Sequence, residues 1–364
     1  MRRMILTVLV LFLLAQPVFA AQGQEPAETF GADTLEEALD EQTRQALTDV
    51  TPTSGGSFGK QLLKILLNAL SSSAGSLRQA LLAAGKVLAA AMLCTFASGA
   101  QEGAGPKEPA LIAGAFAITA LCTRDMQSMI ALARETIEKI SDFTTLLLPV
   151  LSSCLAASGG SVSAGALLAG SSLIMSFLAR LSTGVLIPLV YVYILLSAAE
   201  SAMDTEALGK IRELTGWAIG LLTKGVCIAF TAYLSLSRLL TGPADAAGVK
   251  AAQAAFSGMV PVVGSILADA SESLLASAGV IRSAAGMFGM LAVLSMAAVL
   301  FLRLGAFYLA LKLAGAIGAG SVCKAHAGLI GNLSSAMGFM MAIAGSTLWM
   351  ALVSAACFLM AVSG

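Results

Sequence analysis

Two acidic residues, Asp269 and Glu272, lie in an otherwise apolar stretch and are the side chains of this sequence best placed for chemistry. Their spacing of three places both carboxylates on one face of a helix. A charged side chain at the centre of a bilayer costs roughly 2.5–3.5 kcal/mol on insertion scales, and a short carboxylate cannot reach far toward water. The pair therefore indicates the polar lining of a passage or an intersubunit ion pair, with a place at the membrane interface as the alternative.

The stretch that carries these acids, Gly258–Gly289, is also punctuated by Pro and Gly. Unsatisfied backbone groups in hydrocarbon cost several kcal/mol each, so a broken helix persists there only when protein buries it or when it lines a wet cavity. We therefore expect this stretch to belong to a multi-helix assembly. The residues expected at a conduit or assembly surface are Pro149, Pro261, Gly264, Asp269, Glu272 and Arg282.

Other charges fall at membrane depth along the chain. Arg282 or Arg303 is a candidate to neutralise the acidic face. The remaining ones are expected at an interface, where a long side chain extends its charge into water while its stem stays in apolar surroundings. These are Arg180, Glu200, Lys224 and Lys312.

The sequence contains no catalytic motif: no Walker-type phosphate loop, no H-E-x-x-H pair and no G-x-S-x-G elbow. The glycines of Ala314–Gly320 follow no strand and favour close helix packing. Six scattered cysteines form no C-x-x-C pair, and the single histidine, His326, cannot build a metal site alone. We therefore expect no enzymatic activity, no cofactor and no metal.

The amino-acid composition indicates whether this chain belongs in water or in a membrane. Of its 364 residues, 57% are hydrophobic and 12% are charged, with a mean hydropathy of +0.87, whereas soluble domains carry about 25% charged residues. The formal net charge is zero, and no basic stripe indicates a nucleic-acid surface. The composition predicts an all-α polytopic membrane protein, a bundle of six to eight membrane-embedded helices, some broken at Pro or Gly, plus amphipathic interfacial helices.

The N-terminal residues differ from the rest. Met1–Ala20 combines two arginines, an apolar run and a small-residue cleavage pattern, which favours a cleaved signal peptide over an uncleaved first helix. Residues 1–58 hold eight acidic and three basic side chains, whereas residues 59–364 hold 13 and 18. We interpret residues 21–58 as an acidic exported arm and linker with one weak helical patch, Thr34–Leu47. Residues 59–364 form the predicted helical membrane domain.

Two segments are amphipathic. Lys60–Ala84 is apolar but contains scattered Lys and Arg, a pattern that suits the membrane interface. Arg124–Phe143 has apolar residues every three or four positions and the oppositely charged pairs Arg134–Glu138 and Glu135–Lys139 on its other side. Lys and Arg are spread too evenly to orient every loop, and Met203–Glu213 is the predicted cytoplasmic one.

One internal likeness suggests a duplication. LLLPVLSSCLAAS (Leu146–Ser158) aligns without gaps on GMVPVVGSILADA (Gly258–Ala270), with Pro149 against Pro261. In transporter folds, interrupted segments at corresponding positions of two halves point to the pathway. Repeats are therefore predicted around residues 124–200 and 240–320, unless the match reflects only a composition rich in Ala, Leu, Ser and Gly.

The stretch Tyr233–Leu291, which includes SRLLTGPADAAGVKAAQAAFSGMVPVVGSILADASESLLASAGVIRSAAGMFGML, resembles stage III sporulation protein AE of endospore-forming bacteria. The likeness extends over about residues 60–364 and leaves out the N-terminal arm. It implies a multi-pass protein of the mother-cell membrane around the forespore, within a multiprotein channel often compared with specialised secretion systems. The implied partners are other membrane subunits of that complex, ring-forming proteins and a cytosolic secretion-type ATPase. The family brings no catalytic residues to carry over.

Together these features favour a non-enzymatic membrane subunit of a sporulation channel or secretion-like complex that links mother cell and forespore and is required for forespore development. A self-contained secondary transporter would also fit a duplication and membrane-depth charges. A membrane scaffold without a conduit of its own is the third hypothesis.

Overall fold

The computed structural model describes residues 35, 37–40, 43–44, 47, 58–99, 108–158, 161–203, 205–259 and 263–360. The side chains at 238–259 and 263–281 lie outside this description, as do the predicted signal peptide, Met1–Ala20, and Pro261. The described residues form long helices and no strand. The helices are α5 (Phe58–Gly99), α6 (Glu108–Ala157), α7 (Ser161–Leu181), the π-helical turn η1 (Ser182–Leu186), α8 (Ile187–Met203), α9 (Glu206–Met259), α10 (Val263–Gly318) and α11 (Lys324–Met360).

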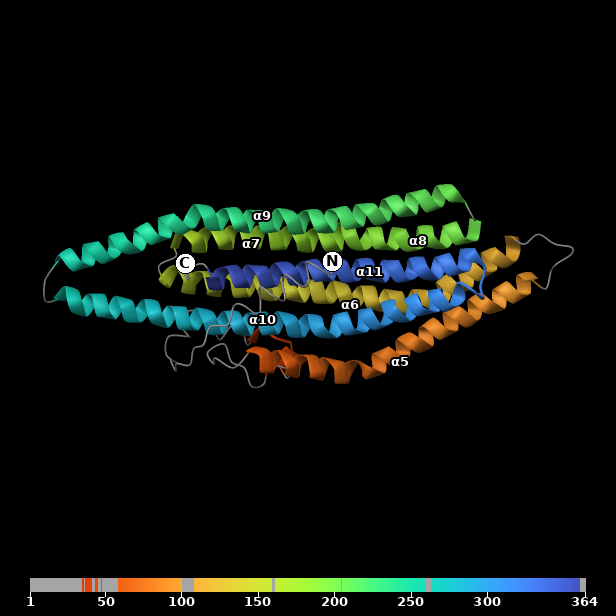
Figure 1. Cartoon of the computed structure of the whole chain (residues 1–364), viewed down its shortest axis with the longest axis horizontal. Coiled ribbons are helices and arrows are strands. Elements are labelled where there is room, and N and C mark those ends of the chain that lie inside the picture. The colour runs from red at the N-terminus through yellow and green to blue at the C-terminus, as the bar shows by residue number, and fades with distance from the viewer. Residues whose placement is uncertain are drawn as a thin grey trace.

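The helices lie side by side in one elongated bundle, in which successive rods run in opposite directions (Figure 1). Six described helical rods are long and apolar enough to cross a membrane, a finding that confirms the predicted all-α polytopic class. Their candidate spans cover 23 to 46 residues, whereas a bilayer core needs about 20. Most rods are therefore longer than one crossing requires.

The α7, η1 and α8 segments form one continuous rod, although the sequence predicted two pieces, Val162–Ala179 and Thr183–Ala199. At the junction the N–H of Ile187 donates to the carbonyl of Ser182, five residues back. Pro188 follows at once and has no N–H to donate, so the α-helical ladder is interrupted here in any case. A π-helical turn accommodates this interruption without ending the rod.

The 50 residues of α6 run without a break, whereas the sequence predicted separate pieces between Pro109 and Ala157 and an interruption at Pro149. The predicted interruption at Pro149 is wrong. Pro149 lies on the exposed face, and so does Thr145, whose carbonyl loses its N–H partner. The buried side chains of Leu148 and Leu151 hold the helix to the core on both sides.

The predicted loop Met203–Glu213 is also mostly helical, because only residues 204 and 205 separate α8 from α9. The charges in this segment therefore lie on the first turns of α9 and not on a long loop. Pro261 falls between the ends of α9 and α10, and α10 begins one residue before Gly264. The two helices extend together beyond the rest of the bundle as a hairpin (Figure 1).

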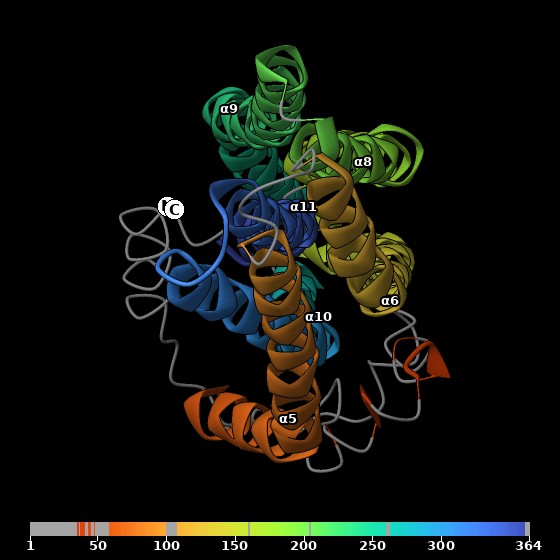
Figure 2. The same ribbon diagram turned by 90° about the vertical axis from the view of Figure 1, so that its right-hand side faces the viewer.

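The centre of the bundle is α11, which is surrounded by α10, α6, α8 and α9 when viewed along the long axis (Figure 2). Residues 327–360 of this helix contain no charged side chain. A helix that is apolar all round can be buried on every side, and Leu333, Met337, Met340 and Phe358 are fully enclosed.

The predicted helical patch of the acidic arm packs against the bundle of the same chain. Leu35, Leu39 and Leu47 are at most 6% exposed and join an apolar cluster with residues of α6 and α10. Asp40 accepts a hydrogen bond from the N–H of Thr43 at 3.1 Å, as an N-cap residue does. The described part of the arm is thus anchored on its own membrane domain.

Candidate functional site

The charged face of α6 lies about halfway along the bundle. Arg134 pairs with Glu138 at 3.0 Å and Glu135 pairs with Lys139 at 2.9 Å, which confirms both predicted pairs. The four side chains are 42–61% exposed. Charges on a membrane protein are costly where they face hydrocarbon, so this part of α6 lies against headgroups, water or another protein.

Two further helices contribute charges at the same level. The hydroxyl of Ser152 on α6 donates to the carbonyl of Ala164 on α7 at 3.2 Å, which fixes the register of these two antiparallel helices. Arg180 lies 16 residues after Ala164, so it lies beside residue 136 of α6, which is 16 residues before Ser152. The ring of Tyr233 lies against residue 170 of α7, and the same count places Lys224 beside Arg180. Both basic side chains are exposed, and their predicted place at a membrane interface stays a prediction.

Arg303 of α10 lies at the same position along the bundle axis, because it lines the same cavity as Glu135 and Lys139. We call the set the polar belt. Its members are Arg134, Glu135, Glu138, Lys139, Arg180, Lys224 and Arg303.

The polar belt divides the apolar core into two clusters. On α6 one cluster ends at Ile137 and the other begins at Ile140, and on α10 the corresponding residues are Leu300 and Ala297. We call the part from the belt to the α8–α9 turn the proximal layer and the part from the belt to the α6–α7 turn the distal layer. Each layer takes in about 20 residues of a helix, or about 30 Å, which is the thickness of one bilayer core.

The proximal layer carries large apolar side chains on its outer surface. Phe96 of α5 is 73% exposed, Phe116 of α6 is 67% exposed and Trp217 of α9 is 62% exposed. The α5 candidate span, Gly75–Ala97, lies in this layer, since Gly318 of α10 packs near Leu88. The proximal layer therefore has the surface of a bilayer-embedded domain.

A cavity of about 500 Å³ opens in the polar belt between α5, α6, α10 and the arm. Arg303 projects its charge here, and its Nε is enclosed without a hydrogen-bond partner among the described residues. On the opposite side Lys139 bridges Asp40 (3.1 Å) and Glu135 (2.9 Å). Burial raises the pKa of Asp40, but the hydrogen bonds from Thr43 and Lys139 outweigh it and hold that pKa below its ordinary value of 3.8.

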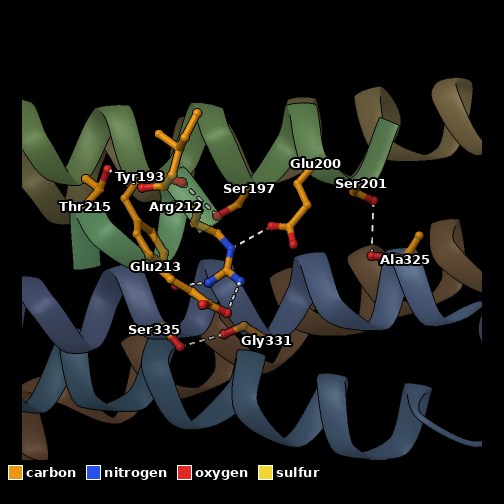
Figure 3. A network of polar contacts seen from close by, with 11 residues as sticks. Tyr193, Ser197, Glu200, Ser201, Arg212, Glu213, Thr215, Ala325, Gly331 and Ser335 are labelled. Atoms are coloured by element: carbon orange, nitrogen blue, oxygen red, sulfur yellow. Dashed lines mark hydrogen bonds and ion pairs between the residues drawn. The ribbon is translucent and has the colours of Figure 1, made fainter. Parts of the chain in front are cut away.

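A second polar cluster fastens the α8–α9 turn to α11 (Figure 3). The guanidinium of Arg212 donates to Glu200 at 2.6 Å and to the hydroxyl of Tyr193 at 3.3 Å, with its centre 5.7 Å from the Tyr193 ring. Tyr193 in turn meets Phe339 edge-on at 5.1 Å. A Cβ on Gly209 would lie only 2.7 Å from Glu200, so glycine leaves room for the ion pair.

Glu200 was predicted at an interface, and the structure adds the partner that sequence reasoning missed. Arg212 stands twelve residues away across a helical turn, and no local spacing rule connects positions so placed. The Asp40–Lys139 contact was missed for the same reason, because its partners are 99 residues apart. Lys312 is exposed on α10, and its predicted place at an interface stays a prediction.

Arg282 is the predicted site residue that the structure describes most fully. It is 8% exposed and lies near the buried Cys154 of α6, and its Nε and Nη1 have no hydrogen-bond partner among the described residues. Because α10 is one helix here, its backbone separates Arg282 from Glu272 by about 15 Å and from Asp269 by about 20 Å. Arg282 therefore does not reach either acid along the same helix, and the predicted neutralisation of the acidic face by Arg282 or Arg303 stays a prediction.

The other predicted site residues are only partly described. Pro149 faces outward from α6. Gly264, Asp269 and Glu272 belong to the backbone of α10, but their side chains and surroundings lie outside the description, so their predicted role stays a prediction. In the described part of the chain no three His, Cys, Asp or Glu residues come close enough to hold a metal ion.

In the described part of the chain, six long antiparallel apolar helices define a polytopic α-helical membrane protein. The family model for stage III sporulation protein AE matches residues 41–362, so this chain belongs to the stage III sporulation protein AE family. The match begins at residue 41, inside the acidic arm, which the resemblance seen in the sequence left out.

One curated relative is stage III sporulation protein AE of Bacillus subtilis (strain 168), which is 24% identical over 186 residues. The aligned part covers 51% of this chain and 46% of that protein, so the match spans less than half the length of the relative. No solved structure matches this chain.

Proposed function

We propose that this protein is a non-enzymatic membrane subunit of a channel or secretion-like complex that links mother cell and forespore and is required for forespore development. It lies in the mother-cell membrane around the forespore. Membership of the stage III sporulation protein AE family supports a sporulation role. The observation that carries the assembly role is the polar belt, which places a cluster of exposed charges about halfway along the bundle.

The length of α6 supports this role. Alpha6 is a helix of 50 residues, hence about 75 Å long, and one bilayer core covers about 30 Å of it. If the proximal layer fills the bilayer, the polar belt lies at the headgroups and the distal layer extends beyond the lipid. The distal layer has exposed apolar side chains of its own, which require cover by protein. They include Leu146, Leu173, Phe177 and Leu236.

Two features indicate which end of the bundle faces the cytoplasm. A cleaved signal peptide would leave the arm outside the cytoplasm, and the arm packs at the polar belt. Basic residues gather near the α8–α9 and α10–α11 turns, whereas residues 143–179 and 325–364 contain no Lys or Arg. By the positive-inside rule the turns face the cytoplasm, and both features place the distal layer on the outer side.

This orientation assigns a side to each class of partner. Ring-forming proteins and other membrane subunits of the same complex meet the distal layer in the space between the two cells. A cytosolic secretion-type ATPase meets the cytoplasmic turns and supplies the energy, because the sequence contains no phosphate loop for ATP.

The test is affinity isolation of the tagged protein from sporulating cells in mild detergent. The wild-type chain should bring along membrane and ring-forming partners. Arg180→Glu combined with Lys224→Glu reverses two exposed charges of the belt and should lower partner recovery and spore yield at least tenfold at unchanged membrane abundance. Arg180→Lys with Lys224→Arg keeps the charges and should behave as wild type. Transport by the purified chain alone in vesicles would overturn the proposal in favour of a secondary transporter.

A further inference from the structure

The cavity in the polar belt has walls from four parts of the chain. Alpha5 contributes Asn68, α6 contributes Glu135 and Lys139, α10 contributes Arg303, and the arm contributes Asp40. A volume of about 500 Å³ lies within the range of small-molecule sites. The arm wall is fixed in place by its buried leucines and by the Asp40–Lys139 ion pair.

The charges around the cavity are separated by sign. Among the residues that line this cavity in the described part of the chain, Asp40 and Glu135 share the cation Lys139, so two carboxylates face one ammonium on that side. Asp142 adds another acid to a smaller neighbouring cavity of about 290 Å³. On the α10 side Arg303 has no ion-pair partner among the described residues, and its enclosed Nε lacks an acceptor. The site therefore offers a positive pole and a negative pole with open space between them.

A ligand that satisfies both poles carries an anionic and a cationic group at once. A simple anion would satisfy Arg303, but it would face the surplus negative charge of Asp40 and Glu135. A simple cation would meet the reverse problem at Arg303. A guanidinium with a free Nε–H is well suited to bind phosphate or carboxylate oxygens, and the acidic side is suited to an ammonium group.

The depth of the cavity and the surface beside it identify the source of such a ligand. Ala69 of α5 lines the cavity and lies six residues before the α5 candidate span begins at Gly75, which is about 9 Å along a helix. This is the depth of the lipid headgroups. Leu77, Leu81 and Leu82 are each about half exposed within the α5 candidate span and provide an apolar surface for acyl chains.

We propose that this cavity binds the headgroup of a phospholipid that carries both a phosphate and an ammonium group, such as phosphatidylethanolamine, in the outer leaflet. The phosphate lies on Arg303 and the ammonium lies on the side of Asp40 and Glu135. The docked arm closes the headgroup into the site, so the lipid and the arm hold each other in place. The choice of the outer leaflet rests on the orientation proposed above, whereas the binding site itself does not depend on the partners or cargo of the sporulation complex.

Native mass spectrometry of the full chain, purified in mild detergent from cells that contain phosphatidylethanolamine and phosphatidylglycerol, tests the proposal. The wild-type protein should retain phosphatidylethanolamine preferentially. Arg303→Gln should reduce this retention about tenfold, the loss expected from one charge-assisted hydrogen bond. Lys312→Gln removes an exposed cation from the same helix outside the cavity and should retain lipid as the wild type does.

Glu135→Gln separates binding from a structural effect, because Glu135 is 61% exposed and its loss leaves Lys139 paired with Asp40. This variant should keep phosphate binding but lose most of the preference for phosphatidylethanolamine over phosphatidylglycerol. Thermal-shift titration with glycerophosphoethanolamine tests the free zwitterion as a source, and a shift equal to that given by the lipid would overturn the lipid assignment. Equal retention by Arg303→Gln and Lys312→Gln, or no preference in the wild type, would overturn the site itself.

Discussion

Arg212 and Glu200 form the most enclosed ion pair among the described residues, with side chains 14% and 29% exposed. The pair also holds Tyr193, which packs on α11 through Phe339. The Arg134–Glu138 pair has the same charges but is 57% and 49% exposed, and water screens it. The contribution of an ion pair to the free energy of unfolding depends on its burial, because removing one partner of an enclosed pair leaves the other charge poorly solvated.

We therefore predict that Glu200→Gln destabilises the protein by about 1–3 kcal/mol, because it leaves the enclosed Arg212 guanidinium with only the longer carboxylate contact to the exposed Glu213 at 3.6 Å. Glu138→Gln, the matched control in an exposed pair, should cost about 0–1 kcal/mol. Thermal unfolding in detergent with a tryptophan or dye readout measures both. Equal losses for the two variants would contradict a clamping role for Glu200 at the α8–α9 turn.

At the scale of helices, close approach between α7 and α9 depends on a glycine. The Tyr233 ring lies directly over Gly170, where an added Cβ would overlap the ring, and its hydroxyl donates to the carbonyl of Ala166 at 2.7 Å. Gly165 lies on the same helix but faces open space, since no atom lies within 4 Å of a Cβ added there. One helix thus offers a packing glycine and a matched control.

Gly170→Ala is predicted to destabilise the protein by about 1–3 kcal/mol, because Tyr233 must move and give up its hydrogen bond. Gly165→Ala should be neutral or stabilising by up to about 1 kcal/mol, since alanine favours the helix. Comparison of the unfolding midpoints of both variants with that of the wild type tests this prediction. An unchanged midpoint for Gly170→Ala would mean that the α7–α9 contact tolerates a wider spacing.

The helical class, the number of rods and the α6 ion pairs followed from sequence because periodicity, hydropathy and i,i+4 spacing are local properties. Helix ends did not follow. Pro149 predicts a break locally, yet packing on both sides of this proline keeps α6 continuous. Contacts between distant positions, such as Arg212 with Glu200 and Asp40 with Lys139, have no local pattern and appear only once the helices are placed.

At the scale of the whole molecule, the polar belt and the unequal distribution of Lys and Arg give one topology. In the proposed orientation the arm and the α6–α7 turn lie outside the cytoplasm, and the α8–α9 and α10–α11 turns lie inside. Six crossings then return the C-terminal end of α11 to the outer side. The hairpin of α9 and α10 extends beyond the distal layer on that same side (Figure 1).

This topology predicts the labelling of single cysteines introduced into a chain whose six native cysteines are replaced. Ala157→Cys, exposed at the end of α6, should react with a membrane-impermeant maleimide in intact cells. Ser321→Cys, exposed between α10 and α11, should react only after permeabilisation, because the positive-inside rule places its turn in the cytoplasm. Glu138→Cys should also react in intact cells if the polar belt lies at the outer headgroups, and Leu313→Cys, exposed in the proximal layer, should resist labelling because lipid covers it. Labelling of Ser321→Cys but not Ala157→Cys in intact cells would reverse the orientation and place the arm on the cytoplasmic side.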